Sequence, residues 1–302
     1  MSRIHDALKK AGQDRFQPPD AEASAFISDA PFSSRSTPMV PNAAVGGTNL
    51  SPVRLEDMVS ACPISSWRLD SRLLMFSDAH SDVRGAEEFR TLRSHLTQFR
   101  EKQPLQTVLI TSALPGEGKT FVTANLGQAI AQQHGKRVLL LDADLRVSAL
   151  HQLLGASLSP GLAEFLNGEA DAASILQRGQ QENLYLISGG RAVPNPVELI
   201  STGRLKILLH QLAPLFDWII LDSPPTIPVS DSRLLAELCD GILLVVRSGE
   251  TPYDAAQKTC QQFQERHVLG VVLNSVAPGQ GYAAYYYSPS MPGQPSTNGH
   301  KR

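Results

Sequence analysis

The chain has few cysteines and almost no excess charge, and each shortage argues against a class of protein. Among its 302 residues, 3 cysteines lie far apart without a CxxC pair. A disulfide scaffold or a zinc site is therefore not expected, and a reducing compartment is. With 27 basic and 29 acidic residues, the formal net charge is −2. This argues against nucleic acid as a partner, because phosphate neutralisation needs a basic surplus.

Long hydrophobic runs are also absent. No apolar segment approaches the roughly 20 residues that a membrane helix needs. The opening MSRIHDALKKAGQ has no apolar region of the kind found in secretory signals. We therefore expect a cytoplasmic protein.

Tyrosine is scarce and unevenly placed. Only 6 tyrosines occur, and two of them, Tyr185 and Tyr253, lie well inside the chain. The other four crowd together near the C-terminus: Tyr282, Tyr285, Tyr286 and Tyr287. Composition alone gives this cluster no role.

Composition divides the chain into four parts. Residues 1–12 fit a short helix with Ser2 as its N-cap. Residues 13–80 are rich in Pro, Ser, Ala and Asp without a sustained period, and they predict a flexible linker. Residues 81–276 carry the patterns of a folded domain, and residues 277–302 predict a disordered tail that contains the tyrosine cluster.

Within the domain, short runs of Val, Ile and Leu alternate with helical patterns. Such runs are typical of strands that are covered on both faces. We therefore expect an α/β fold of P-loop NTPase type, with a doubly wound, mostly parallel sheet and helices on both faces. The expected strands are 106–112, 137–143, 184–188, 217–222, 241–246 and 269–274, and the expected helices are 82–99, 119–133, 202–213, 230–238 and 253–266.

A phosphate-binding motif follows the first expected strand. Residues 113–120, ALPGEGKT, fit the P-loop pattern with Ala113 in place of the first glycine. Gly116 and Gly118 let backbone N–H groups wrap around phosphate, and the next helix directs its positive dipole end at the anion. Lys119 can reach the β- and γ-phosphates, and the Thr120 hydroxyl can ligate Mg²⁺. The alternative is a glycine-rich turn with an accidental GKT.

Three aspartates end two other strands. Asp142 and Asp144 lie in LLLDADLR, and Asp222 lies in WIILDSPP. Because ligands of an open parallel sheet bind beyond the carboxyl ends of its strands, we expect these carboxylates to converge on Lys119. A few carboxylates together with substrate phosphates suit Mg²⁺. The alternative is that each aspartate only caps the turn or helix that follows.

These motifs together resemble the bacterial tyrosine kinase (BY-kinase) family, the cytoplasmic P-loop autokinases of capsule and exopolysaccharide synthesis. The family's Walker A motif corresponds to SALPGEGKT, its Walker A′ to LLLDADLR and its Walker B to IILDSPP. The segments GLAEFLNG (161–168) and PNPVELIS (194–201), and the opening SRIHDALKKA, also resemble family segments. The resemblance covers the chain from about Asp82 to the tyrosine tail.

The resemblance implies an ATP-dependent protein-tyrosine kinase and a role for each matching residue. Asp142 would accept the tyrosine proton or orient its hydroxyl. The family usually has a basic residue and proline after the Arg of Walker A′, but here Val147 and Ser148 follow, which bears on substrate docking. The implied catalytic residues are Lys119, Asp142, Asp144 and Asp222, the implied Mg²⁺ ligands are Thr120, Asp144 and Asp222, and the implied ATP contacts are Pro115, Gly116, Glu117, Gly118, Lys119, Thr120 and Arg146.

The resemblance also implies regulation and partners. The tyrosine cluster would accept phosphate, and its phosphorylation would regulate exopolysaccharide polymerisation and export. Glu87, Arg90 and Arg93 have an ExxRxxR spacing and would form the contact of a ring-shaped homo-oligomer, whereas spacing alone favours a solvated face with ion pairs. A transmembrane chain-length-determinant protein would activate the chain and recruit it to the inner face of the cytoplasmic membrane. A cognate tyrosine phosphatase would remove the phosphate from the tyrosines by hydrolysis.

Three other interpretations remain. A partition or division-site ATPase has the same fold but usually carries a lysine at the second P-loop position, where this chain has Leu114. A small metabolic ligase is the second, although no substrate pocket can be inferred. The third is a binding module with a vestigial ATPase, against which Lys119, Thr120 and the three aspartates argue.

Overall fold

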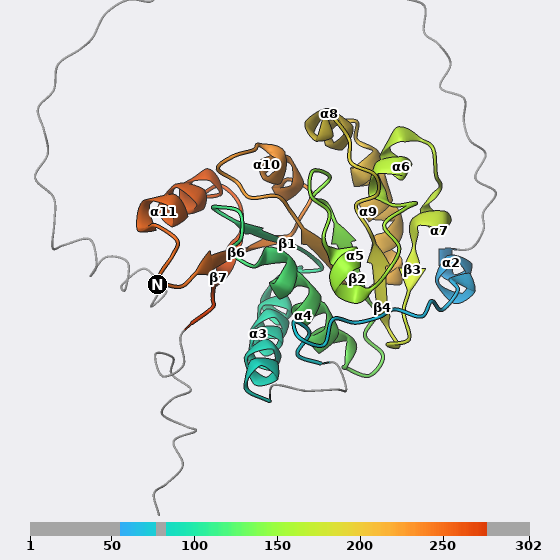
Figure 1. Ribbon diagram of the computed structural model, residues 1–302, viewed down its shortest axis with the longest axis horizontal. Helices are drawn as coiled ribbons and strands as arrows, with labels where there is room; N and C mark the ends of the chain where they lie inside the picture. The colour runs from blue at the N-terminus through green and yellow to red at the C-terminus, as the bar shows by residue number, and fades with distance from the viewer. Residues whose placement is uncertain (1–54, 77–82, 277–302) are drawn as a thin grey trace, which may run out of the picture. The chain divides into compact units, whose positions relative to one another are not determined.

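The computed structural model describes residues 55–76 and 83–276 (Figure 1). The expected N-terminal helix, residues 13–54 and 77–80 of the expected linker, and the tyrosine tail lie outside the described residues. In the described part of the chain, no helix combines the length and the apolar character needed to cross a membrane.

Seven strands form one sheet in the order β3-β4-β2-β5-β1-β6-β7. Every neighbouring pair is parallel except β3–β4. β1 is an interior strand with β5 and β6 at its sides, so the loop after β1 opens at the carboxyl edge of the sheet between these two neighbours. The strands are β1 (Thr107–Ser112), β2 (Val138–Asp142), β3 (Gln177–Arg178), β4 (Leu184–Ile187), β5 (Trp218–Asp222), β6 (Gly241–Arg247) and β7 (Val268–Asn274).

Helices pack on both faces of this sheet, and α3 and α4 pack against each other (Figure 1). The helices are α2 (Leu55–Ala61), α3 (Val83–Lys102), α4 (Lys119–Ala131), α5 (Leu150–Leu154), α6 (Leu162–Asn167), α7 (Ala172–Ile175), α8 (Pro196–Ser201), α9 (Arg204–Leu212), α10 (Asp231–Ala236) and α11 (Tyr253–Gln262), with a 3-10 turn η1 (Ala213–Leu215).

The strand side chains alternate between two hydrophobic cores. Leu139 and Leu141 of β2 belong to the core that α6, α8 and α9 cover, whereas Leu140 belongs to the core that α3 and α4 cover. Successive side chains of a strand point to opposite faces, so the uninterrupted apolar runs reflect burial on both sides. This confirms the doubly wound, mostly parallel sheet that the sequence predicts.

The six expected strands agree with the observed ones to within one residue at each end. The five expected helices also form, with ends that differ by up to four residues. The sequence missed β3, which has 2 residues, and the helices α5 to α8, which have 4 to 6. Elements this short contain too little of a repeat to show a periodic pattern.

The expected linker at 13–80 includes a segment that packs on the domain. Residues 55–76 begin with α2 and continue as an extended strap, a name we keep for residues 62–76. Trp67 and Leu74 of the strap are 6% and 1% exposed and belong to the core under α3 and α4. The linker assignment therefore does not hold for residues 55–76. Val59 and Cys62 of the same segment are also buried, in the other core. These apolar side chains attach a segment whose average composition predicts a linker.

Backbone hydrogen bonds complete the attachment of the strap. Ser65 donates its N–H to the Arg178 carbonyl at 2.8 Å, at the outer side of β3. In α4 the buried Asn125 amide accepts the Met75 N–H at 2.7 Å and donates to the Leu73 carbonyl at 3.1 Å. The strap is thus bound both to the sheet edge and to the helix that follows the phosphate-binding loop.

Candidate active site

The carboxyl ends of β1, β2 and β5 bring together the residues that the motifs single out. The phosphate-binding loop connects β1 to α4, Asp142 is the last residue of β2 and Asp222 is the last residue of β5. Asp142 and Asp222 are register partners on neighbouring strands. Lys119 is the first residue of α4, and its charge acts on both Asp222 and Asp144. One site therefore contains the lysine and all three carboxylates.

Two glycines shape the phosphate-binding loop. Gly116 has a φ of 79° and Gly118 a φ of 95°, in the left-handed region that L side chains rarely adopt. Gly118 occupies the N-cap of α4, where no side chain of the described residues caps the helix. The first N–H groups of α4 are therefore available to an anion.

Asp142 and Asp222 are 0% and 1% exposed. Burial, with the Asp142 charge as a second cause, raises the pKa of Asp222 to about 8, and burial raises the pKa of Asp142 to about 6. A nearby cation would favour the charged form of both groups. The nearby Thr120 hydroxyl lowers the pKa of Asp222, and the Thr123 hydroxyl donates to Asp222 Oδ1 at 3.4 Å. Carboxylate and hydroxyl oxygens are the ligands that suit a hard cation such as Mg²⁺.

The segment after β2 fixes the orientation of Asp142. Its Oδ2 accepts the Ser148 hydroxyl at 2.7 Å and the N–H groups of Ala149 and Leu150 at 3.0 and 3.1 Å, and its Oδ1 accepts the Asp144 N–H at 3.2 Å. These hydrogen bonds lower the pKa of Asp142 but do not offset burial. Ser148 stands where the sequence departs from the family pattern, and here it is a direct donor to Asp142.

Asp144 and Arg146 lie in the loop that follows β2. The Asp144 Oδ1 accepts the N–H groups of Arg146 and Val147 at 3.1 and 3.0 Å, and burial raises the pKa of Asp144. The Arg146 guanidinium donates to both oxygens of Asp231, at 2.8 and 3.1 Å. Arg146, which the resemblance assigns to ATP, is therefore engaged with Asp231 in this structure. The sequence missed Asp231 because it resembles any acidic residue in a first helical turn.

Glu117 has a more specific position than the sequence suggests. Its side chain is 3% exposed and lies inside the phosphate-binding loop. It accepts the Leu114 N–H at 2.6 Å and the Thr251 hydroxyl, while Asn274 donates to the Glu117 carbonyl at 2.9 Å. No local pattern could have identified Thr251 or Asn274, which are 134 and 157 residues away from Glu117 in the chain.

The three residues of the ExxRxxR spacing do not share one environment. Arg90 pairs with Glu87 at 2.5 Å, and both side chains are exposed. Arg93 instead donates to the Ala129 carbonyl of α4 at 2.7 Å, and burial lowers its pKa. In this structure α3 thus has one surface ion pair and one arginine that binds α4.

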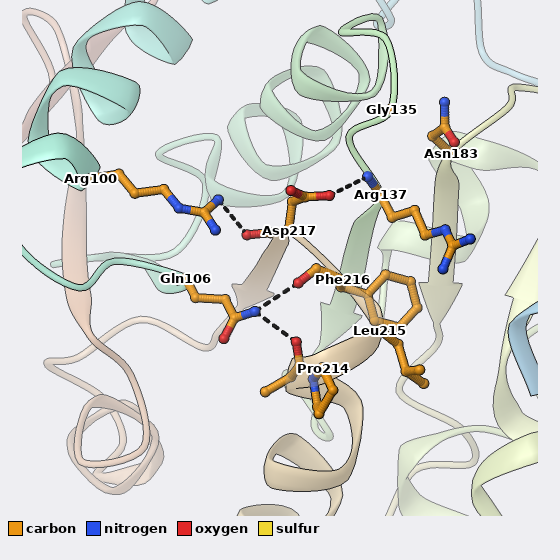
Figure 2. Close-up of a pocket in the computed structure, with 10 residues that line it drawn as sticks. Arg100, Gln106, Gly135, Arg137, Asn183, Pro214, Leu215, Phe216 and Asp217 are labelled. Atoms are coloured by element: carbon orange, nitrogen blue, oxygen red, sulfur yellow. Dashed lines mark hydrogen bonds between the residues drawn. The ribbon is translucent and has the colours of Figure 1, made fainter. Parts of the chain in front are cut away.

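A cavity of about 480 Å³ opens at the opposite edge of the sheet (Figure 2). Gln106, Arg137, Asn183 and Asp217, which line it, each immediately precede a strand. Arg100 donates to the Asp217 carbonyl at 2.7 Å at this edge. The cavity therefore lies at the amino ends of the strands and is separate from the site around Lys119.

Comparisons with known proteins agree with this geometry. Residues 108–286 match the CobQ/CobB/MinD/ParA nucleotide binding domain. The tyrosine-protein kinase YwqD of Bacillus subtilis is 34% identical over 191 residues, which are 63% of this chain and 80% of that protein. The tyrosine-protein kinase wzc of Salmonella typhimurium is 33% identical over 204 residues, 67% of this chain but only 28% of that longer protein.

A solved structure extends the comparison to three dimensions. The kinase domain of Escherichia coli tyrosine kinase ETK superposes with a TM-score of 0.60 at 32% identity, covering 65% of this chain and 80% of that one. Sequence, fold and site agree in one assignment: the chain belongs to the bacterial tyrosine kinases, a branch of the CobQ/CobB/MinD/ParA nucleotide-binding family.

Proposed function

We propose that the chain transfers the γ-phosphoryl group of ATP, with Mg²⁺, to tyrosine hydroxyls of its own C-terminal cluster. The observation that carries this proposal is the convergence of Lys119, Thr120 and three strand-end carboxylates on one glycine-rich loop. The family membership supplies the acceptor type, a protein tyrosine.

Each residue has a physical task in the proposed reaction. Lys119 neutralises charge on the transferred group, and the free N–H groups at the start of α4 bind phosphate oxygens. Thr120, Asp144 and Asp222 would hold Mg²⁺, which neutralises the charge on the phosphates. Asp142 orients the tyrosine hydroxyl or accepts its proton. Because phosphoryl transfer has a loose transition state, positioning matters more than a strong base.

The acceptors would be the tyrosine cluster at 282–287. Each phosphate adds about −1.5 to −2 charges, so full modification would change a chain whose formal net charge is −2 several-fold. The added charge would repel the tail from a site that already contains three carboxylates. Phosphorylation is therefore proposed to release the tail and to loosen any assembly that the tail holds together.

We place this activity in the control of exopolysaccharide polymerisation and export. The proposed partners are a transmembrane chain-length-determinant protein that activates the chain at the inner face of the cytoplasmic membrane, other copies of this chain in a ring, and a tyrosine phosphatase. The exposed Glu87–Arg90 pair is the part of the ExxRxxR spacing that remains accessible to a neighbouring subunit.

The decisive experiment is phosphate mapping by mass spectrometry after incubation with Mg·ATP, with membranes of the source organism added in a second series. We compare the wild type with Lys119→Met and with Lys136→Met, a matched control whose lysine pairs with Asp217 at the other edge of the sheet. We expect phosphotyrosine in residues 282–287 of the wild type and of Lys136→Met, and none in Lys119→Met.

A second variant set identifies the acceptors. Replacing the four clustered tyrosines by phenylalanine should abolish the signal, whereas Tyr253→Phe should not, although Tyr253 is 46% exposed. ATP hydrolysis without any phosphotyrosine, with and without membranes, would reject the kinase and favour the alternative, a partition or division-site type of positioning ATPase.

A further inference from the structure

The carboxyl group of Glu117 lies inside a loop that the proposed function assigns to a triphosphate. A negative side chain so close to a phosphate site is unfavourable unless it has another task. Glu117 is 3% exposed, so its charge is not dissipated by solvent. Its position needs an explanation beyond the P-loop pattern, in which any residue can stand between the two glycines.

The contacts of Glu117 indicate what its carboxyl group does in the loop. Oε2 accepts the Leu114 N–H at 2.6 Å, which closes the loop across three residues. Oε1 accepts the hydroxyl of Thr251, which lies between β6 and α11. The Thr251 hydroxyl oxygen in turn accepts the Arg247 N–H at 3.0 Å. One carboxyl group therefore joins the start of the phosphate-binding loop to the end of β6.

Asn274 at the end of β7 makes a second attachment. Its Nδ2 donates to the Glu117 carbonyl at 2.9 Å. A Cβ atom at Gly118 would come within 2.0 Å of the same Nδ2, so the amide occupies the space that a side chain at 118 would need. A side chain at 118 would have to displace this amide from the Glu117 carbonyl, and the φ of 95° at Gly118 independently favours glycine.

These attachments determine which backbone groups remain available. The Glu117 carbonyl accepts a hydrogen bond from Asn274, and the Leu114 N–H is bound by the Glu117 side chain. Within the described residues, the N–H groups of Gly116, Glu117 and Gly118 donate to no protein acceptor. Unpaired N–H groups in succession are the arrangement that binds a phosphate.

We propose that Glu117, Thr251 and Asn274 are positioning residues that preorganise the phosphate-binding loop. They hold its carbonyls outward and its N–H groups inward before the nucleotide arrives, so that binding does not bear the entropy cost of ordering the loop. The inference rests on the proposed nucleotide site but concerns a position that the P-loop pattern leaves open, Glu117, and two residues outside the loop, Thr251 and Asn274. Thr251 acts through the Glu117 side chain and Asn274 through the Glu117 carbonyl.

The test compares Thr251→Val, which removes the hydroxyl at nearly constant shape, with Thr251→Ser, which keeps it. Two properties are measured: the Kd for Mg·ADP by calorimetry, and amide hydrogen exchange of residues 112–119 in the free protein. We expect Thr251→Val to weaken binding about tenfold, as the loss of a hydrogen bond to a charged group predicts, and to speed exchange in the loop. Thr251→Ser should stay within about twofold of the wild type.

Thr259→Val is the matched control. Thr259 lies in α11, the helix that follows Thr251, and its buried hydroxyl pairs with that of Thr226 at 2.8 Å. Removing this pair should leave both the Kd and the loop exchange unchanged. Wild-type Kd and unchanged exchange in Thr251→Val would overturn the positioning role. If the wild type itself bound no nucleotide, the proposed function would fail, and the exchange rates alone would decide on the role of Thr251.

Discussion

Asp142 and Asp222 end neighbouring parallel strands as register partners, and the Ala143 N–H next to Asp142 donates to the Asp222 carbonyl at 2.9 Å. The sheet thus holds two buried carboxyl groups side by side. Charge on either one disfavours charge on the other. Without a cation the pair retains a proton to higher pH than an ordinary carboxyl group.

This pair predicts an unusual pH dependence of stability. Burial raises the folded-state pKa of Asp222 to about 8 and that of Asp142 to about 6, above the value of about 3.9 for an unfolded chain. Between about pH 4 and pH 8 the folded state binds more protons, so the free energy of unfolding falls as the pH rises. The slope is at most about 1.4 kcal/mol per pH unit for each carboxyl group.

The measurement is urea unfolding of the nucleotide-free protein between pH 6 and pH 8.5. Asp222→Asn should flatten the slope and raise stability at pH 8. Asp217→Asn should leave the slope unchanged, because the pKa of Asp217 is lowered despite partial burial, chiefly by the hydrogen bond from Lys136. A wild-type protein that gains stability across this range would contradict the interpretation.

The Arg146–Asp231 pair predicts a coupled loss of stability. Asp231 is 1% exposed and Arg146 38%, so removing the arginine leaves a buried carboxylate without its cation. We expect Arg146→Met to lower the free energy of unfolding by about 2 kcal/mol. This is somewhat less than the loss that follows when one partner of a fully buried ion pair is removed. When Asp231→Asn is added to Arg146→Met, the loss in the free energy of unfolding should be smaller than the sum of the losses in the two single variants.

A double-mutant cycle by denaturant unfolding measures this coupling. A coupling energy of about 1 kcal/mol or more would agree with a paired role. Strictly additive losses would show that the two residues act independently.

Glu164 predicts a stability effect in GLAEFLNG (161–168), which resembles a family segment. It accepts the Gly161 N–H at 2.8 Å, the Ser159 hydroxyl at 2.9 Å, and the Arg191 N–H and guanidinium at 3.1 and 2.9 Å. Burial alone would raise its pKa, but these hydrogen bonds lower the pKa of Glu164 to about 2. Glu164 therefore connects the loop before α6 to the loop after β4.

Glu164→Ala should destabilise the protein by about 2–3 kcal/mol, because several donors lose their acceptor. Since its folded pKa is lowered, the wild-type contribution is present above about pH 4.5 and is lost as the pH falls toward 2. Glu169→Gln is the control, because the Glu169 side chain is 49% exposed and pairs with Arg191, which is also exposed. A loss no larger than that of the control at pH 7 would contradict this role.

The sequence predicted most of what lies in regular, repeated patterns. The strands were predicted from apolar runs such as VLLLD. That the phosphate-binding loop and the strand-end aspartates lie at the same edge was predicted from the geometry of a parallel sheet. The sequence did not predict contacts between distant segments. Thr251 reaches Glu117 across 134 residues, and Asp231 reaches Arg146 across 85. Such pairs depend on the finished fold, and neither partner is distinctive within its own segment.

The strap gives the last prediction, because its attachment is the largest departure from the sequence-based expectation. Leu74 is 1% exposed in the core with α3 and α4, and Asn125 of α4 hydrogen-bonds the backbone on both sides of it. Leu74→Ala should therefore destabilise the whole domain by about 2–5 kcal/mol, the range for a buried leucine. The same substitution in a true linker would lower the free energy of unfolding by less than about 0.5 kcal/mol.

The matched control is Leu73→Ala, since Leu73 is 44% exposed next to Leu74 in the same strap. Cooperative urea unfolding by circular dichroism measures both variants. A large loss for Leu74→Ala with a small one for Leu73→Ala would show that the strap is part of the domain. Equal, small losses would restore the linker interpretation of these residues. In the first case the strap also supports α4, so Leu74→Ala should speed amide exchange in α4, where Asn125 holds the strap backbone.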